Sequence, residues 1–409
     1  MTDPATVDVV TALAAKGSTV RFVGGCVRDT LLGRPVKDVD IATPDTPERV
    51  VALLTAAGIK TVPTGLAHGT ITAVTRDRHF EVTTLRRDVD TDGRHATVEF
   101  TDEWEADAGR RDFTFNALYA DRDGTIYDPT GGLDDLAEGR VRFVGDAAVR
   151  IEEDHLRILR FFRFVAYFGR TAPDADAVAA CEARVDLLKT LSAERVAAEV
   201  LRTLSAPEPT AALALMGSVG VLQAVLPEAT RLEVMPRLRD IEVSSGFEPN
   251  ALLRLASLMA PQTGAAIASR LARRLKLSNA DKRRLTAYVA PPVAITPNMS
   301  SGQVHAALYR AGYRLFTDLV FLAWARLGKQ HDDFIRLLQD AARWDIPVFP
   351  ITGDDLKSGG IPEGPEIGQL LEELEGWWVE GDFRADREAC LQRLRERRRH
   401  RARRRPAPR

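Results

Sequence analysis

The chain has little cysteine and no long apolar run. Three cysteines occur among 409 residues, Cys26, Cys181 and Cys390, and they are too far apart and too few for a disulfide framework or a zinc-binding spacing. Each is expected to be a small buried residue or a free thiol. No apolar stretch is long enough to span a membrane, and the acidic N-terminus lacks a signal-peptide pattern. Together these shortages predict a cytoplasmic location.

Internal repeats and histidine clusters are also missing. No segment stands out as recurring at a fixed period, so the sequence does not predict a repeat architecture. The His331-Asp332 dipeptide stands alone, so the sequence does not predict a metal-dependent phosphohydrolase domain. The composition is that of an ordinary globular protein, with 45% hydrophobic and 28% charged residues, and the length is sufficient for two to four domains.

The formal net charge of −2 conceals a strong asymmetry. Residues 391–409 contain ten arginines and one glutamate, a net of +9, which leaves −11 for the remainder of the chain. A basic tail on an acidic body is suited to an anionic partner such as RNA. A disordered tail that only aids solubility explains the same composition equally well.

Two aspartates close the stretch Val23 to Ala42, whose sequence is VGGCVRDTLLGRPVKDVDIA. Asp40 lies in a short apolar run that predicts a buried strand, and residues two apart on a strand point to the same face. Asp38 and Asp40 therefore present two carboxylates on one surface. Two neighbouring carboxyl groups resist ionisation unless a cation lies between them. Mg²⁺, which prefers oxygen ligands, is the natural candidate for that cation. Taken alone, a D-x-D triplet is also common in solvated turns.

Two glycines open the same stretch, between a predicted strand over 20–23 and a predicted helix over 26–32. Glycine at such a junction lets backbone N–H groups approach a phosphate at the helix N-terminus. Gly24 and Gly25 are therefore candidate phosphate-binding residues, and Arg28, one turn into the helix, can reach the same anion. Taken alone, a Gly-Gly pair can also be an ordinary tight turn. Glycines, arginine and carboxylates together indicate a nucleoside triphosphate site.

The combination G-G-x-x-R-D followed by D-x-D resembles the DNA polymerase β-like nucleotidyltransferases. Within them the chain resembles the class II tRNA nucleotidyltransferase (CCA-adding) and bacterial poly(A) polymerase family. The resemblance implies an α+β fold, in which an N-terminal head with a small mixed β-sheet and helices is followed by all-helical neck, body and tail domains. It also implies that Asp38 and Asp40 bind the catalytic Mg²⁺ and that Gly25 and Arg28 contact the incoming nucleotide.

Glu81 is a candidate third catalytic carboxylate. Strands predicted over 60–62, 69–75 and 79–85 form a small mixed sheet flanked by helices. If the strand over 79–85 pairs beside the strand of Asp40, Glu81 comes close to the aspartate pair. Enzymes of the resembled superfamily often use a third acidic residue on a neighbouring strand. A glutamate on a solvent-facing edge is the alternative.

The string R-R-D-F-T-x-N-A-L occurs within residues 108–118, which the sequence predicts to be helical. An arginine pair can bind a triphosphate, and an aspartate can accept hydrogen bonds from ribose hydroxyls. A structural helix with an internal Arg–Asp pair is the alternative. The string resembles the family motif, which implies that Arg111 contacts the nucleotide and Asp112 the ribose. The polar segment 86–103 is predicted to be a mobile loop, similar to the flexible loop of CCA-adding enzymes.

Residues 150–168 are predicted to form one long amphipathic helix. Asp154 and Arg157 share a face of it, and Arg160 and Arg163 follow at steps of three. A carboxylate beside a guanidinium can recognise the amino group and ring of cytosine or adenine, whereas uracil and guanine offer a carbonyl there. An intrahelical ion pair is the alternative.

The string E-D-x-x-R-x-x-R-x-x-R resembles the family motif in this helix. The resemblance implies that Asp154 and Arg157 read the base and that Arg160 and Arg163 face the nucleotide, at its phosphates. Glu194, Arg195 and Glu199, further along the chain, are expected to be structural charges that brace this base-reading helix.

No strand pattern of any length follows residue 174, and the remainder of the chain is predicted to be helical. The predicted domains are a nucleotidyltransferase head over 1–145, a base-reading helical neck over 146–205, a helical body over 206–291, a helical RNA-binding tail over 292–390 and an arginine-rich C-terminal tail over 391–409.

The resemblance, which is strong over about residues 20–205, implies a template-independent nucleotidyltransferase. Its expected reaction is the addition of CCA to the 3′ end of tRNA from CTP and ATP, with Mg²⁺ as cofactor and pyrophosphate as product. Poly(A) polymerase, or a separate CC-adding or A-adding enzyme, is the alternative within the family. A non-catalytic RNA-binding protein is the alternative from another class, and the complete aspartate pair argues against it.

Overall fold

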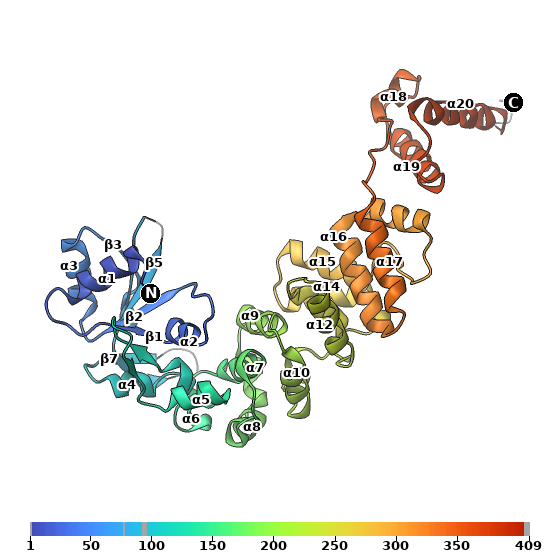
Figure 1. Ribbon diagram of the computed structural model, residues 1–409. Helices are drawn as coiled ribbons and strands as arrows, with labels where there is room; N and C mark the ends of the chain where they lie inside the picture. The colour runs from blue at the N-terminus through green and yellow to red at the C-terminus, as the bar shows by residue number, and fades with distance from the viewer. Residues whose placement is uncertain (1, 77, 92–95, 405–409) are drawn as a thin grey trace. The chain divides into compact units, whose positions relative to one another are not determined.

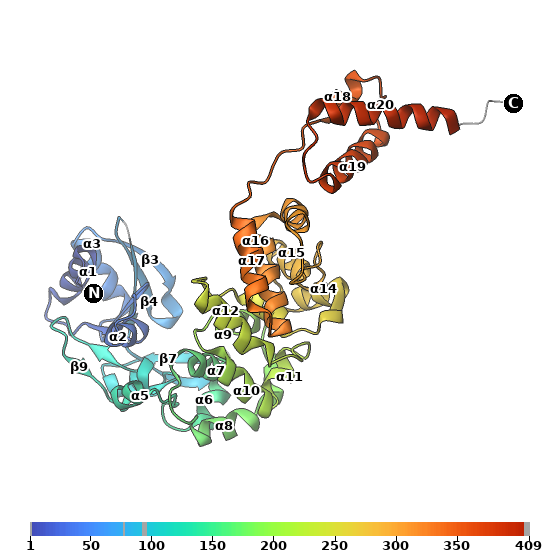
Figure 2. The same cartoon turned by 45° about the vertical axis from the view of Figure 1, so that its right-hand side comes forward.

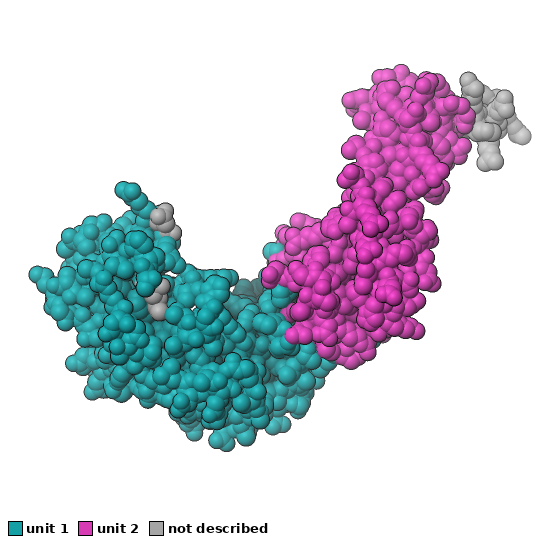
Figure 3. Space-filling view, in the orientation of Figure 1, with its two compact units in different colours: residues 1–232, 249–251, 271–278 teal, residues 233–248, 252–270, 279–409 magenta. Residues whose placement is uncertain are grey.

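The computed structural model describes residues 2–76, 78–91 and 96–404. They fall into two compact units, drawn in teal and magenta in Figure 3. The first unit comprises residues 1–232, 249–251 and 271–278, and the second comprises residues 233–248, 252–270 and 279–409. The finer division into head, neck, body and tail stays a prediction.

A seven-stranded mixed sheet lies in the N-terminal part of the first unit, as predicted (Figure 1). Its strand order is β3-β4-β5-β2-β1-β8-β9, in which the β2–β5 pair is parallel and the other pairs are antiparallel. The strands are β1 Arg21–Val23, β2 Val39–Thr43, β3 Lys60–Gly65, β4 Thr70–Val74, β5 His79–Thr84, β8 Tyr119–Ala120 and β9 Ile126–Tyr127.

Successive side chains of strand β2 point to opposite faces of the sheet. Val39 and Ile41 are buried, whereas Asp40 between them faces the other side and is partly exposed. The parallel register with β5 sets Asp40 beside Glu81, so the condition on which the candidacy of Glu81 depended is met. Asp38 precedes β2 and is exposed.

Short helices pack on this sheet. α2 contacts β1 and β2, α3 contacts β3, β4 and β5, and α1 packs on α3. The helices and 3₁₀ turns of this region are α1 Pro4–Ala14, α2 Gly25–Leu31, α3 Pro47–Ala56, η1 Leu66–His68, α4 Trp104–Gly109, η2 Thr114–Asn116 and α5 Gly132–Glu138.

The polar segment after β5 contains a β-hairpin where a loop was expected. β6 Arg86–Thr91 pairs antiparallel with β7 Ala96–Phe100. Arg87 and Glu99 are Cα partners in this register and form an ion pair of 2.8 Å, and such cross-strand pairs of opposite charge stabilise a hairpin. Residues 92–95 of the predicted mobile loop lie outside the described residues.

Residues 108–118 do not form the predicted helix. α4 ends at Gly109, and Phe113 is extended with φ −125° and ψ 148°. The ring of Phe113 packs on Phe143 and Phe164 at centroid distances of 4.7 and 5.0 Å, and Phe115 packs on Phe164 at 5.3 Å. The extended backbone at Phe113 and the 3₁₀ turn η2, which contains Phe115, bring both rings onto Phe164.

The predicted helix over 150–168 is interrupted at Asp154. α6 Ala147–Glu153 ends there, and α7 Arg157–Phe168 begins beyond it. Asp154 is extended, with φ −152° and ψ 105°, and its carboxylate accepts a hydrogen bond from the N–H of Leu156. A short polar side chain that caps the following backbone in this way competes with helix continuation. Asp154 therefore precedes the helix that carries Arg157.

Further helices complete the first unit, and α7 packs against α9 and α10 (Figure 2). The apolar face of α7 is buried as its periodicity predicts, through residues such as Leu159, Phe162 and Phe168. These elements are α8 Ala175–Glu182, η3 Val185–Thr190, α9 Ala193–Leu204, α10 Pro209–Ser218 and α11 Val221–Val225.

The described part of the second unit is helical, as predicted. α16 is interrupted at Gly312, where φ is +73°, and α12 and α13 are joined by a fully buried ion pair between Glu242 and Arg254 of 2.7 Å. The remaining elements, of which α13 and α14 have residues in both units, are α12 Val234–Ser244, α13 Ala251–Ser257, η4 Pro261–Thr263, α14 Gly264–Arg274, α15 Asn279–Val289, α16 Ser301–Leu327, α17 His331–Ala342, α18 Gly353–Ser358, α19 Pro365–Glu380 and α20 Arg387–Arg404.

Two expectations from the scarcity of cysteine and of apolar runs can be compared with these elements. Cys26, Cys181 and Cys390 are all buried and free, as predicted. Within residues 2–76, 78–91 and 96–404, no helix is both long enough and apolar enough to cross a membrane.

Gly132, the first residue of α5, provides a test of the packing of α5 against η2. A Cβ atom there would lie 2.3 Å from the carbonyl oxygen of Thr114 and 2.9 Å from the nitrogen of Phe115, so backbone must move to admit it. We expect Gly132→Ala to lower the free energy of unfolding by about 1–3 kcal/mol, measured by urea denaturation. Gly109→Ala is the control, because nothing lies within 4 Å of its Cβ position. Equal stability of the two variants would contradict the described packing.

Candidate active site

A polar cavity of about 430 Å³ lies in the first unit, between the sheet and α7. Six arginines and three aspartates line it, so a net positive charge surrounds the space and favours an anionic ligand. The lining residues are Gly24, Gly25, Arg28, Asp40, Arg110, Arg111, Asp112, Asn116, Asp154, Leu156, Arg157, Arg160, Phe164 and Arg195.

Most of the residues singled out in the sequence meet at this cavity. Asp40 and all the predicted nucleotide-binding residues except Arg163 line it, whereas Asp38 and Glu81 do not. The structure thus brings together the glycine pair of β1–α2, the R-R-D string and the motif of α6–α7. The roles of the individual residues stay predictions.

Asp40 is surrounded by more negative than positive charge. Burial, Glu81 and Asp38 together raise the pKa of its carboxyl to about 6, although Arg111 opposes them. A divalent cation would relieve this accumulation of negative charge, so the donors present fit a hard metal ion. Among the described residues, no group of three His, Cys, Asp or Glu side chains is placed to hold a metal by itself.

That result limits how a metal could bind. Asp38 and Asp40 would supply part of a coordination sphere, and nucleotide phosphates and water would supply the remainder, as is usual for Mg²⁺. Glu81 stands beside Asp40 in the β2–β5 register but does not complete a three-carboxylate site, and its catalytic role stays a prediction.

The glycine pair leaves room for arginine side chains. Gly24 has φ +74°, and a Cβ atom there would lie 3.5 Å from Nη1 of Arg111. Arg28, one turn into α2, donates to Asp29 at 2.9 Å and to Oδ1 of Asn116 at 2.6 Å. Its guanidinium is therefore already oriented at the cavity wall.

Asp107 holds the arginine pair and was missed in the sequence. Its carboxylate is buried and accepts from Arg110 at 2.7 Å, from Arg111 at 2.9 Å and from the hydroxyl of Tyr119 at 2.7 Å. Burial alone would raise the pKa of Asp107, but Arg111 and Arg110 hold it well below its usual range. The i,i+3 and i,i+4 spacing to two arginines was the available signal.

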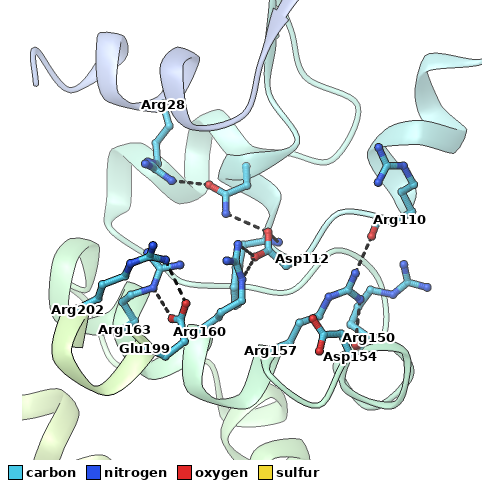
Figure 4. Close-up of polar contacts among 12 residues, drawn as sticks. Arg28, Arg110, Asp112, Arg150, Asp154, Arg157, Arg160, Arg163, Glu199 and Arg202 are labelled. Carbon is cyan, nitrogen blue, oxygen red and sulfur yellow. Dashed lines mark hydrogen bonds and ion pairs between the residues drawn. The ribbon is translucent and has the colours of Figure 1, made fainter. Parts of the chain in front are cut away.

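Asp112 connects the R-R-D string to α7. Its Oδ2 accepts from Nε of Arg160 at 2.7 Å, and its Oδ1 accepts from the N–H of Phe113 and from Asn116 (Figure 4). Burial would raise its pKa, but Arg160 and the hydrogen bond from Asn116 lower it. The carboxylate is therefore charged.

Asp154 and Arg157 line the cavity without pairing with each other. Asp154 accepts from Nη2 of Arg195 at 2.9 and 2.8 Å. Arg157 donates to Glu153 and, at 2.9 Å each, to the carbonyl oxygens of Arg150 and Arg110 (Figure 4). Their ion pairs among the described residues are instead Arg157 with Glu153 and Asp154 with Arg195, so the alternative of an intrahelical pair between them is not what the structure shows. Arg195 matches the bracing charge expected on α9.

Arg163 is directed away from the cavity. It donates to the buried carboxylate of Glu199 at 2.6 Å, and Arg202 lies 3.5 Å from the same carboxylate (Figure 4). Its guanidinium also lies over the ring of Phe164, 4.2 Å from the centroid. These contacts join α7 to α9 and fit the bracing role expected of Glu199.

Comparisons with known proteins identify the family of the chain. The family model of the poly A polymerase head domain matches residues 20–142, and that of the probable RNA and SrmB-binding site of polymerase A matches residues 172–232. The mitochondrial CCA tRNA nucleotidyltransferase 1 of Danio rerio is 36% identical over 92% of this chain and 86% of its own length. A CCA-adding enzyme of Streptococcus pneumoniae is 32% identical over 95% of this chain and 96% of its own length.

A solved structure extends the likeness to the whole fold. The Bacillus stearothermophilus CCA-adding enzyme in complex with CTP matches with a TM-score of 0.76 and 29% identity, over 98% of this chain and 99% of that one. A mixed-sheet head with an arginine-lined cavity and an aspartate pair is the arrangement of a nucleotidyltransferase. The chain belongs to the family of CCA-adding tRNA nucleotidyltransferases and poly(A) polymerases.

The field around Asp40 gives a prediction for the metal-free protein. Removing the negative charge of Glu81 favours ionisation of Asp40, so Glu81→Gln should lower the pKa of Asp40 below its value of about 6. Carbon-13 NMR of the carboxyl groups, in the presence of a chelator, measures this. Glu48→Gln, on the exposed side of α3, should leave it unchanged. If the pKa of Asp40 were the same in Glu81→Gln as in the wild type, the placement of Glu81 beside Asp40 in the β2–β5 pair would be contradicted.

Proposed function

We propose that this chain adds C, C and A in turn to the 3′ end of tRNA, from CTP and ATP, and releases pyrophosphate. The observation that carries the proposal is the cavity itself, which is lined by arginines suited to a triphosphate together with Asp40, Asp154 and Arg157. The likeness of nearly the whole chain to CCA-adding enzymes supports it.

The triphosphate would bind among the guanidiniums of the cavity. Arg28 and Arg111 lie beside the glycine pair, where backbone N–H groups can also face phosphate oxygens. In-line attack of the tRNA 3′-hydroxyl oxygen on the α-phosphorus forms the new P–O bond and breaks the bond to pyrophosphate. The arginines hold the triphosphate, and then the leaving pyrophosphate, through charge-assisted hydrogen bonds.

Asp38 and Asp40 are the residues that would hold a divalent ion. Membership of the nucleotidyltransferase family implies use of such a metal, and we propose Mg²⁺, because the donors are hard oxygens and too few to form a complete cage. When bound, the ion would lower the pKa of the attacking hydroxyl and neutralise phosphate charge.

Asp154 and Arg157 retain the hydrogen-bonding capacity that base reading needs. Oδ2 of Asp154 accepts one described hydrogen bond, from Arg195, so one of its two lone pairs remains. Arg157 uses Nη1 twice and Nη2 once among the described residues, so its Nε–H and a second Nη2 hydrogen remain. One acceptor and two donors match the amino-bearing edges of cytosine and adenine.

Poly(A) polymerase is the second candidate, and the match of the poly A polymerase head domain over residues 20–142 favours it. The relatives that match over most of the chain are CCA enzymes, which supports CCA addition. A cytoplasmic location stays a prediction, since the Danio rerio relative is a mitochondrial enzyme.

Primer extension with Mg²⁺ tests the proposal. Three RNAs are offered, a tRNA that ends before CCA, a tRNA that ends in CC and an unstructured oligonucleotide, each with the four nucleotides singly and with CTP plus ATP. We expect two C's and then one A, on tRNA only. Long A tracts on any 3′ end would establish poly(A) polymerase instead, and no extension would favour a non-catalytic RNA-binding protein.

The variant Asp38→Ala separates chemistry from RNA binding. It should abolish extension, because a divalent ion would lose one of its two protein ligands, and leave the affinity for tRNA unchanged. Filter binding at fixed salt measures that affinity. Extension at the wild-type rate would show that the metal site has been assigned to the wrong residues.

A further inference from the structure

Asn116 is a buried amide in the cavity wall that the sequence-based predictions left without a role. It ends the turn η2 and is 9% exposed. Its Oδ1 accepts a hydrogen bond from Nη1 of Arg28 at 2.6 Å, and its Nδ2 donates to Oδ1 of Asp112 at 3.0 Å. A guanidinium can only donate and a carboxylate can only accept, so the orientation of the amide is dictated by its two neighbours.

The contacts continue from Asp112 to helix α7. Oδ1 of Asp112 also accepts from the N–H of Phe113 at 2.9 Å, while Oδ2 accepts from Nε of Arg160 at 2.7 Å and from Nη2 of the same residue. Arg28, Asn116, Asp112 and Arg160 thus form one continuous chain of hydrogen bonds across the cavity wall, in the region drawn in Figure 4.

We infer that Asn116 is a positioning residue, which orients Arg28 and the Asp112–Arg160 pair for the incoming nucleotide before it binds. The inference rests on the proposed function. Without the amide, Arg28 keeps Asp29 and the ring of Phe168 as partners, but its Nη1 loses the acceptor on Asn116. The Asp112 carboxylate loses a donor that fixes its rotation. Groups that are ordered in advance bind a ligand better, because less side-chain freedom is lost on binding.

The expected signature is a change in KM with little change in kcat. Asn116 would affect the binding of the nucleotide and not the chemical step, because it orients two arginines that bind the nucleotide. Loss of one hydrogen bond to each of two charged groups should weaken CTP binding about tenfold or more. A residue that contributed only to the stability of the fold would not raise KM while leaving kcat nearly unchanged.

Arg157 offers a matched control on the same helix. It also lines the cavity, one turn before Arg160. Its charge acts on Asp112 from a distance, but its hydrogen bonds go to Glu153 and to the carbonyl oxygens of Arg150 and Arg110. A general structural defect would affect both arginines alike, whereas positioning through Asp112 acts on Arg160.

Two double-mutant cycles on KM for CTP test the inference. Asn116→Ala is combined with Arg160→Ala in one cycle and with Arg157→Ala in the other. At least about fivefold of the effect of Asn116→Ala should vanish when Arg160 is already alanine. With Arg157→Ala the effects should multiply to within about twofold. Asn298→Ala, at an exposed position in the second unit, should leave KM unchanged.

Several results would overturn the inference: an unchanged KM in Asn116→Ala, non-additivity of the same size in both cycles, or none in either. If Asn116→Ala does not fold, Asn116→Asp takes its place, because it keeps the acceptor for Arg28 and cannot donate to Asp112. The cycles are repeated on CTP affinity by calorimetry without primer. A protein that binds CTP but extends no tRNA would refute the proposed function, while the affinity cycles would still decide the role of Asn116.

Discussion

Separation of closely spaced arginines is the constraint on which the cavity depends. Six guanidinium groups line a cavity of about 430 Å³. Positive charges at such short distances repel one another unless anions lie between them. Asp112, Asp154 and Glu153 each hold one of these arginines, and Asp107 alone serves both Arg110 and Arg111. The carboxylates order the arginines, and guanidinium N–H groups that they do not use can still donate to a triphosphate.

The fold meets this constraint by joining two kinds of structure through one aromatic core. The sheet carries the acidic residues on adjacent strands, β2 and β5. The rings of Phe113 and Phe115 pack on Phe164 of α7, and each buried ring contributes about 1.5–3 kcal/mol of hydrophobic stabilisation. Because Asp112 and Asn116 lie beside those phenylalanines, the same packing sets the distance from the R-R-D string to the arginines of α7.

Local patterns in the sequence were sufficient to predict the mixed sheet, and the family resemblance pointed to most of the residues that line the cavity. They failed where a partner distant in sequence decides the outcome. Helical periodicity runs through Asp154, yet its carboxylate caps Leu156 and binds Arg195 on another helix. Residues 108–118 have helical spacing, yet α4 ends at Gly109, Phe113 is extended and η2 follows, and this path buries the rings of Phe113 and Phe115. No spacing rule relates Asn116 to Arg28, which the fold brings together from 88 positions away.

The central claim is that side chains alone select cytosine and adenine, and the variant Asp154→Asn tests it most directly. The asparagine oxygen can still accept from Leu156 and Arg195, so its NH₂ group would face the base and donate to the carbonyl of uracil or guanine. The preference for CTP over UTP in single-nucleotide incorporation on tRNA should then fall about tenfold relative to wild type, because the cytosine amino group loses its acceptor while the donors of Arg157 still oppose the N3–H of uracil. An unchanged ratio of CTP to UTP would contradict the assignment of base reading to Asp154.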